Sequence, residues 1–184
     1  FLEGASTNEG FLLADSYILP RATDADALVE ALVRNFANHL TPELETGFSN
    51  QGLSVYQAVI LASIVERESI VADEMPLIAS VFLNRLSAGW KLESDPTVQY
   101  AIGFDGNWWP NPLSSLDLDF DSPYNTYLYL GLPPAPISNP SLEALRAVAN
   151  PAVTDYFFFR AKCDGSGLHN FSVTLEEHIE NECP

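Results

Sequence analysis

Two glutamates, Glu66 and Glu68, lie near the end of a strongly apolar helical segment, where a carboxyl group can carry out acid–base chemistry. With about 3.6 residues per helical turn, Glu68 falls between Leu61 and Ile64, within the aliphatic arc. Such surroundings raise the pKa of a carboxylic acid and keep it protonated near neutral pH, as general-acid cleavage of a glycosidic bond requires. The alternative is that each glutamate pairs with an arginine, for which Arg85 is a candidate, and helix geometry leaves both interpretations open.

A helix must position both glutamates, and the sequence predicts one that begins at Ser54 and runs to about Ser69. Gln57, three residues after Ser54, completes a capping box at its start. Further helices are expected after the capping residues 23–26 with an end at Pro42, from near Asp73 to Gly89, between Pro140 and Asn150, and from Thr174 onward. Residues 43–53 are expected to form a polar loop.

The remaining segments indicate a hairpin and a long irregular region. Apolar or alternating residues 156–161 and 169–173 flank the turn-forming stretch 163–167, a pattern typical of two antiparallel strands. Residues 90–140 are rich in proline and aromatic rings and show no clear helical period. We expect them to form an irregular segment that contributes to a binding cleft, or else an inert wrap over the core. Helices followed by a late hairpin give the fold class α+β.

The composition excludes several classes of protein. The chain of 184 residues carries 8 Lys+Arg against 25 Asp+Glu, so it lacks the cationic surface that nucleic-acid binding needs. No apolar run approaches the ~18 residues of a membrane span. The chain opens on Phe1 rather than Met, which indicates a processed or cloned fragment.

Residues that could bind a metal are too few or wrongly spaced, so neither a metal nor an organic cofactor is expected. The three histidines are scattered, and the acidic stretch 117–121 lacks the Gly and Glu that an EF-hand calcium loop requires. Cys163 and Cys183 cannot form a zinc site alone. They could form a disulfide that ties down a C-terminal helix, or remain two free thiols.

Several blocks of sequence, in order along the chain, resemble one enzyme family. These blocks are 61–69 (LASIVERES), 79–86 (ASVFLNRL), 92–100 (LESDPTVQY), 124–127 (YNTY), 131–134 (GLPP), 136–137 (PI) and 169–171 (HNF). Together they resemble the MltG (YceG-like) family of endolytic murein transglycosylases. The resemblance implies a helical, lysozyme-like and lytic-transglycosylase-like catalytic core, with peptidoglycan glycan strands as the substrate.

The resemblance also implies where the enzyme works and how this chain relates to it. It implies an extracytoplasmic, membrane-anchored enzyme, with cell-wall synthesis proteins as candidate partners. We expect residues 1–184 to form a single catalytic domain, a fragment without the family's N-terminal membrane anchor and LysM-like region.

The resemblance favours Glu68 as the catalytic acid, with Glu66 as the second candidate. Lysozyme-like muramidases and transglycosylases place the acid directly before Ser or Thr on a helix, and Glu68-Ser69 fits this pattern. Protonated Glu68 would donate to the oxygen between N-acetylmuramic acid and N-acetylglucosamine, then accept the proton of the muramoyl C6 hydroxyl as a 1,6-anhydro ring closes.

The matched blocks also supply candidate substrate-binding residues. These are Asp95, Thr97, Gln99, Tyr100, Tyr124, Asn125, Tyr127 and His169. For several of them a structural role is the alternative: Asp95 could hold a turn, Tyr127 could pack in the core and His169 could be structural. Two other functions remain open, a hydrolytic muramidase and a non-catalytic peptidoglycan-binding module.

Overall fold

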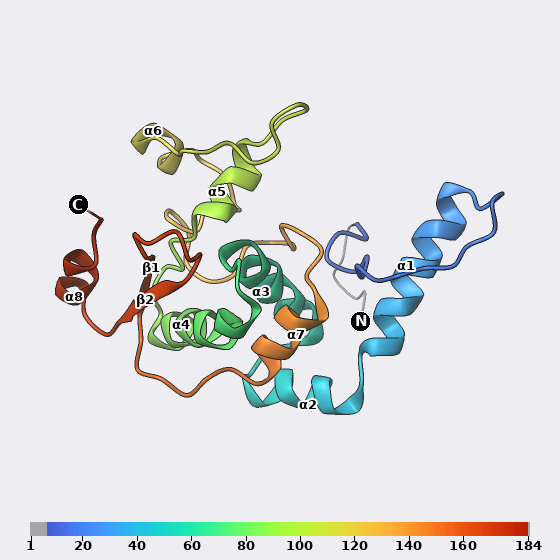
Figure 1. Cartoon of the computed structure of the whole chain (residues 1–184), viewed down its shortest axis with the longest axis horizontal. Coiled ribbons are helices and arrows are strands. Elements are labelled where there is room, and N and C mark those ends of the chain that lie inside the picture. Colours follow the sequence, from blue (N-terminus) through green and yellow to red (C-terminus); the bar gives the residue numbers. More distant parts are fainter. Residues whose placement is uncertain (1–6, 184) are drawn as a thin grey trace.

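Three helices form the centre of the molecule, α3 (Val55–Glu68), α4 (Met75–Ala88) and α7 (Leu142–Ala149) (Figure 1). The computed structural model describes residues 7–183. Every residue from Ala58 to Val65 of α3 is buried, because α4 and α7 pack against it. The capping box of Ser54 and Gln57 predicted at the start of α3 is present, and so is the helix that it begins.

The segment before α3 contains two helices where the sequence predicted one helix and a loop. Helix α1 (Ala25–His39) follows its Asp24 cap as expected. The prediction of a polar loop over residues 43–53 is wrong, because α2 (Pro42–Asn50) occupies most of this range and packs on α7. Pro42 opens this helix rather than closing the previous one: it needs no N–H partner in a first turn, and the Thr41 hydroxyl accepts from the amide of Leu44.

Helix α4 follows a 3₁₀ turn, η1 (Ala72–Glu74), and ends at Gly89, whose φ of 69° is the left-handed conformation expected there. Side chains of α4 hold the chain that leads into the hairpin. The Ser80 hydroxyl lies 2.7 Å from the Thr154 hydroxyl, and the Asn84 amide donates to the carbonyl oxygens of residues 154 and 156. Arg85 Nε donates to the carbonyl of residue 157 at 2.7 Å.

The proline-rich segment 90–140 contains two helices that the sequence did not predict, α5 (Asp95–Ile102) and α6 (Ser115–Leu118). Both are short, with 8 and 4 residues, so their periodicity was too weak a signal among the prolines. The rest of the segment is irregular, as expected, and its last part returns to α3, where the amide of Ile137 donates to the Ser63 hydroxyl (Figure 1).

The expected late hairpin is confirmed and lies on the opposite side of the molecule from α1 (Figure 1). Strands β1 (Phe158–Ala161) and β2 (His169–Ser172) are antiparallel, with residues 158 and 161 opposite 172 and 169. Helix α8 (Leu175–Glu180) begins with the predicted Thr174–Glu177 capping box and packs on both strands. Of the two open alternatives for the cysteines, the structure contains the disulfide Cys163–Cys183.

The fold is therefore mostly helical with one two-stranded hairpin. Among residues 7–183, each helix is too short or too polar to cross a membrane.

Candidate active site

A cleft of about 470 Å³ separates the end of α3 and the start of α5 from the hairpin and α8. Its lining residues are Glu68, Arg85, Leu92, Glu93, Asp95, Tyr127, the strand residues 158–161, His169, Leu175 and His178. Of the ten residues that the sequence singled out, the structure brings Glu68, Asp95, Tyr127 and His169 together here.

Glu68 is the last residue of α3, and its carboxyl group lies where the helix meets the cleft. Its Oε1 accepts a hydrogen bond of 2.5 Å from the hydroxyl of Ser94, which fixes the direction of the carboxyl group. The residue retains partial exposure on the cleft side, so a ligand can reach it.

The pKa of Glu68 is raised from 4.5 to about 7, chiefly by burial and also by the negative charge of Asp95. The hydrogen bond from Ser94 and the positive charges of Arg67 and Arg85 oppose this rise, but burial is the largest cause. An acid with this pKa is substantially protonated at neutral pH and can both give and take a proton there. The site can therefore perform general acid–base catalysis with one carboxyl group.

The arginines near Glu68 bind other partners, which answers the salt-bridge alternative raised by the sequence. Arg85 donates to Glu93 at 3.1 Å and to backbone carbonyls, including that of Leu92 at 2.8 Å. The guanidinium of Arg67 lies over the ring of Trp109, 3.8 Å from its centroid. Neither arginine forms an ion pair with Glu68 in the described structure.

Glu66, the second candidate acid, lies outside the cleft. Its Oε2 accepts hydrogen bonds from the backbone amide of Ser141 at 2.9 Å and from the Ser141 hydroxyl at 2.5 Å. Ser141 is the N-cap of α7, so the Glu66 carboxylate joins α3 to the positive end of that helix.

Asp95 and Tyr127 form a hydrogen-bonded pair in the cleft. Asp95 is the first residue of α5, and its Oδ1 accepts a bond of 2.6 Å from the Tyr127 hydroxyl. Burial and the adjacent Asp95 carboxylate raise the pKa of Tyr127, so the phenol keeps its proton and remains the donor. The pair presents one negative charge beside Glu68 in a fixed position.

His169 lies at the start of β2 and is held by a buried acid from η1. Its Nδ1 lies 2.9 Å from Oε2 of Glu74, and its backbone amide also donates to both oxygens of Glu74. The ring meets Phe159 edge-on, with centroids 5.4 Å apart. These contacts fix the orientation of His169 and attach the hairpin to the helical part of the molecule.

The other five candidate substrate-binding residues do not line the cleft. Thr97 and Asn125 are buried and satisfy neighbouring backbone and hydroxyl groups. Gln99 donates to the carbonyl of Pro110. Tyr100 donates to Glu9 at 2.6 Å and packs against Tyr124, with ring centroids 4.8 Å apart. These residues hold the irregular segment in place.

Among the functional groups that the sequence did not single out, those of Glu93, Arg160 and His178 line the cleft, and the hydroxyl of Ser94 donates to Glu68 without being one of the lining groups. The position of Ser94, directly before Asp95 in a matched block, could have drawn attention to it. Arg160 faces the cleft from β1 and His178 from α8, and no local pattern marks either residue.

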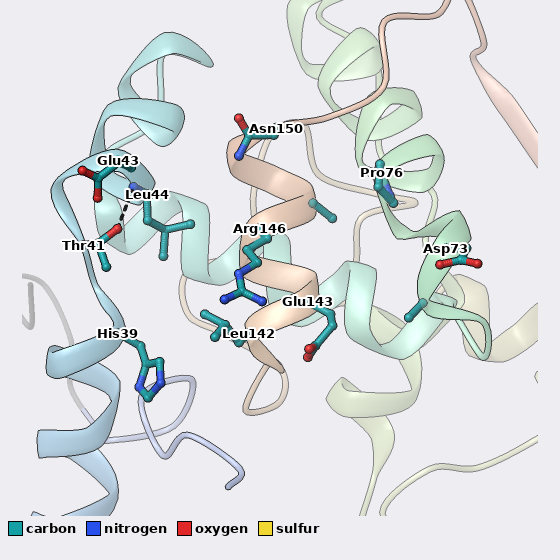
Figure 2. Close-up of a pocket in the computed structure, with 12 residues that line it drawn as sticks. His39, Thr41, Glu43, Leu44, Asp73, Pro76, Leu142, Glu143, Arg146 and Asn150 are labelled. Atoms are coloured by element: carbon teal, nitrogen blue, oxygen red, sulfur yellow. Dashed lines mark hydrogen bonds between the residues drawn. The ribbon is translucent and has the colours of Figure 1, made fainter.

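A larger hollow of about 620 Å³ runs along α7, from Leu142 to Asn150, and is bordered by α1, α2 and η1 (Figure 2). Arg146 and Glu143 face it from α7, and His39 from α1 (Figure 2). No residue predicted to act in catalysis or binding lines it, so we place the site in the smaller cleft. Among the described residues, no cluster of three His, Cys, Asp or Glu side chains could hold a metal ion.

Fold and cleft together define a mostly helical domain in which one partly buried glutamic acid faces an open groove beside a hairpin. The chain belongs to the YceG-like family, whose sequence profile matches residues 2–183.

Relatives of known name support this assignment. The chain is 35% identical over 173 residues to an endolytic murein transglycosylase of Bacillus subtilis, covering 92% of this chain and 46% of that protein. It is 30% identical over 174 residues to an endolytic murein transglycosylase of Streptococcus pneumoniae, covering 94% of this chain and 31% of that protein. The chain thus spans less than half the length of these relatives.

A solved structure shows the same fold. The crystal structure of a YceG-like protein from Listeria monocytogenes superimposes with a TM-score of 0.82 at 35% identity, covering 95% of this chain and 55% of that one.

Proposed function

We propose that this chain is the catalytic domain of an endolytic murein transglycosylase, which cleaves the bond from N-acetylmuramic acid to N-acetylglucosamine inside peptidoglycan strands. The observation that carries the proposal is Glu68, an acid with a pKa of about 7 that faces an open cleft without an ion-pair partner among the described residues. The names of the relatives support the substrate. Because that substrate lies outside the cytoplasmic membrane, we propose that the domain acts there. We also propose that its helical core is lysozyme-like.

The reaction needs one carboxyl group in two protonation states. Protonated Glu68 donates to the glycosidic oxygen as the bond to muramoyl C1 breaks, and the sugar acquires oxocarbenium character. The muramoyl C6 hydroxyl then attacks C1 and gives its proton to the Glu68 carboxylate. The products are a 1,6-anhydromuramoyl end and a free C4 hydroxyl on the released strand, and Glu68 is protonated again.

The neighbours of Glu68 have supporting roles in this proposal. Ser94 orients the carboxyl group through its hydrogen bond. The negative charge of Asp95 favours protonated Glu68 in the free enzyme, and it also stabilises positive charge developing on the sugar ring. Tyr127 holds Asp95 in place, and His169 faces the substrate from the hairpin.

A hydrolytic muramidase is the second candidate, because Asp95 lies in the same cleft as Glu68. In a hydrolase a second carboxylate activates water or attacks the sugar. Here Oδ1 of the Asp95 carboxylate already accepts the Tyr127 hydroxyl, so that oxygen is occupied by the protein, which favours the transglycosylase.

Digestion of purified peptidoglycan followed by mass spectrometry tests the proposal. We expect muropeptides with 1,6-anhydro ends, one water lighter than reducing ends. Glu68→Gln should lower the rate at least about a hundredfold. Glu66→Gln is the matched control, because it changes the same residue type on the same helix outside the cleft, and it should retain activity.

Other outcomes decide among the alternatives. Reducing ends alone would identify a muramidase, and strand binding without cleavage would identify a binding module. Full activity in Glu68→Gln would remove Glu68 from the mechanism.

A further inference from the structure

The basic side chains of this acidic chain are few, and several of them gather in the cleft. The net charge is −17 with only 8 Lys+Arg, yet Arg85, Arg160, His169 and His178 all line the same space. Two of these four are already occupied, since Arg85 binds Glu93 and backbone carbonyls and His169 binds Glu74. The remaining two, Arg160 and His178, each have a buried side-chain nitrogen without a hydrogen-bond partner among the described residues.

Arg160 has an unmet capacity for hydrogen bonding. Its Nη1 is covered by protein atoms and finds no hydrogen-bond acceptor within residues 7–183. The nearest carboxylate recorded for it is that of Glu182, whose Oε1 lies 3.8 Å from Nη1, too far for a hydrogen bond. The side chain of Glu182 is 69% exposed, so water screens this ion pair and it constrains the guanidinium weakly.

His178 lies beside Arg160 and also lacks a partner. Its Nδ1 is buried without a hydrogen bond inside the described structure, and its ring stacks on Phe158 with centroids 5.3 Å apart. Burial and the charges of Arg160 and Arg85 lower the pKa of His178, so its ring is neutral at pH 7. The free positive charge on this wall therefore belongs to Arg160.

The wall that carries both groups is held in place covalently. Arg160 is in β1 and His178 in α8, and the disulfide Cys163–Cys183 joins the turn of the hairpin to the chain just after α8. The two side chains line the cleft together with Glu68 and Asp95, which come from the opposite wall. A ligand reached by Glu68 is thus also within the cleft that Arg160 faces.

We propose that Arg160, with His178 beside it, forms a subsite that binds a carboxylate carried by the glycan strand. This inference rests on the proposed function, because muramic acid is the sugar of peptidoglycan that bears a carboxyl substituent. A planar guanidinium matches a carboxylate with two parallel hydrogen bonds. The carboxylate comes either from the lactyl group of a peptide-free strand or from the peptide attached to it. The subsite would place a muramoyl residue, rather than N-acetylglucosamine, on one side of the scissile bond.

The affinity of glycan probes for catalytically inactive variants of this protein tests the subsite. In a Glu68→Gln background, calorimetry measures the affinity for three tetrasaccharides: peptide-free with lactyl carboxylates, peptide-bearing, and neutral tetra-N-acetylchitotetraose. Adding Arg160→Gln should weaken binding of a carboxylate-bearing probe about tenfold to a hundredfold and leave the neutral probe unchanged. Arg146→Gln, which removes a charge from the hollow on α7, is the matched control and should change none of the three. The probe that loses affinity identifies the source of the carboxylate.

Glu182→Gln separates a binding role from a structural one. If Arg160 serves the substrate, removing its weak partner leaves the affinity unchanged or increases it. If Arg160 only holds Glu182, the Glu182→Gln variant reproduces the loss seen with Arg160→Gln, and the subsite is refuted. An equal loss for the neutral probe also refutes it. Failure of the proposed function is seen separately, because the unsubstituted chain would then cleave no strand at all.

Discussion

The raised pKa of Glu68 predicts that Glu68→Gln stabilises the protein at alkaline pH while removing its activity. The folded protein holds the Glu68 proton up to a pH of about 7, whereas the unfolded chain releases it near 4.5. Between these values the native state binds more protons than the unfolded state, so the free energy of unfolding falls as pH rises. Glutamine does not ionise, so the variant lacks this fall.

The size of the effect follows from the pKa shift. At about 1.4 kcal/mol per pKa unit, moving from 4.5 to about 7 corresponds to a ceiling of about 3 kcal/mol. The difference in unfolding free energy, variant minus unsubstituted chain, should therefore grow by up to about 3 kcal/mol between pH 4.5 and pH 8. Glutamine also keeps an oxygen that accepts the hydrogen bond from Ser94, so the geometry of the site is preserved.

Urea unfolding at pH 5, 6, 7 and 8, followed by circular dichroism, measures this difference. Glu66→Gln is again the control, because it removes one negative charge from the same helix of a chain with net charge −17. Parallel stability profiles for the unsubstituted chain and Glu68→Gln would show that the carboxyl is ionised without penalty in the folded protein. That result would refute the argument from burial on which the catalytic role rests.

Three further predictions concern the neighbours of the acid and the cleft wall. Because the hydrogen bond from Ser94 lowers the pKa of Glu68, Ser94→Ala should move the alkaline decline of the cleavage rate, expected near pH 7, to higher pH; an unmoved pH–rate profile would contradict this. Glu66→Gln should lose about 1–2 kcal/mol in urea unfolding, since it weakens two charge-assisted bonds at the start of α7, and an unchanged midpoint would show that these bonds contribute nothing net. Replacing both Cys163 and Cys183 by Ser should lower stability by about 3 kcal/mol, because the disulfide closes a loop with a sequence separation of 20 residues; equal thermal midpoints with and without reductant would argue against it.

The helices that the sequence predicted correctly have a clear local signal at one end at least. Helix α3 has its capping box and a nearly continuous apolar face, and α4 ends at a glycine in the left-handed conformation. Helix α2 was missed because Pro42 was interpreted as a terminator, although proline also opens helices and Thr41 supplied the cap. Helix α5 was missed because it has only eight residues, too few to show a clear helical periodicity, and a helix this short depends on tertiary packing for its stability.

For the candidate site, the sequence could predict only the environment that a single helix provides. Helical geometry placed Glu68 among aliphatic residues, and the structure gives it the raised pKa that this position implies. Its hydrogen-bond partner Ser94 is 26 residues away, and the pairing of Arg85 with Glu93 depends on how a loop returns to α4. Contacts of this kind arise from tertiary packing, so periodicity and capping rules contain no information about them.

The hydrogen bonds from α4 to the chain before the hairpin determine which positions can accept amino-acid substitutions. Asn84 and Arg85 donate hydrogen bonds to the backbone carbonyl oxygens of residues 154, 156 and 157. A backbone carbonyl is the same whatever side chain its residue bears. Substitutions at 156 and 157 therefore leave this attachment intact, whereas the donors on α4 have no equivalent replacement in length and hydrogen-bonding pattern. We therefore expect substitutions to be tolerated at positions 156 and 157, whose carbonyl oxygens accept these bonds, and to be selected against at Asn84 and Arg85, whose side chains donate them.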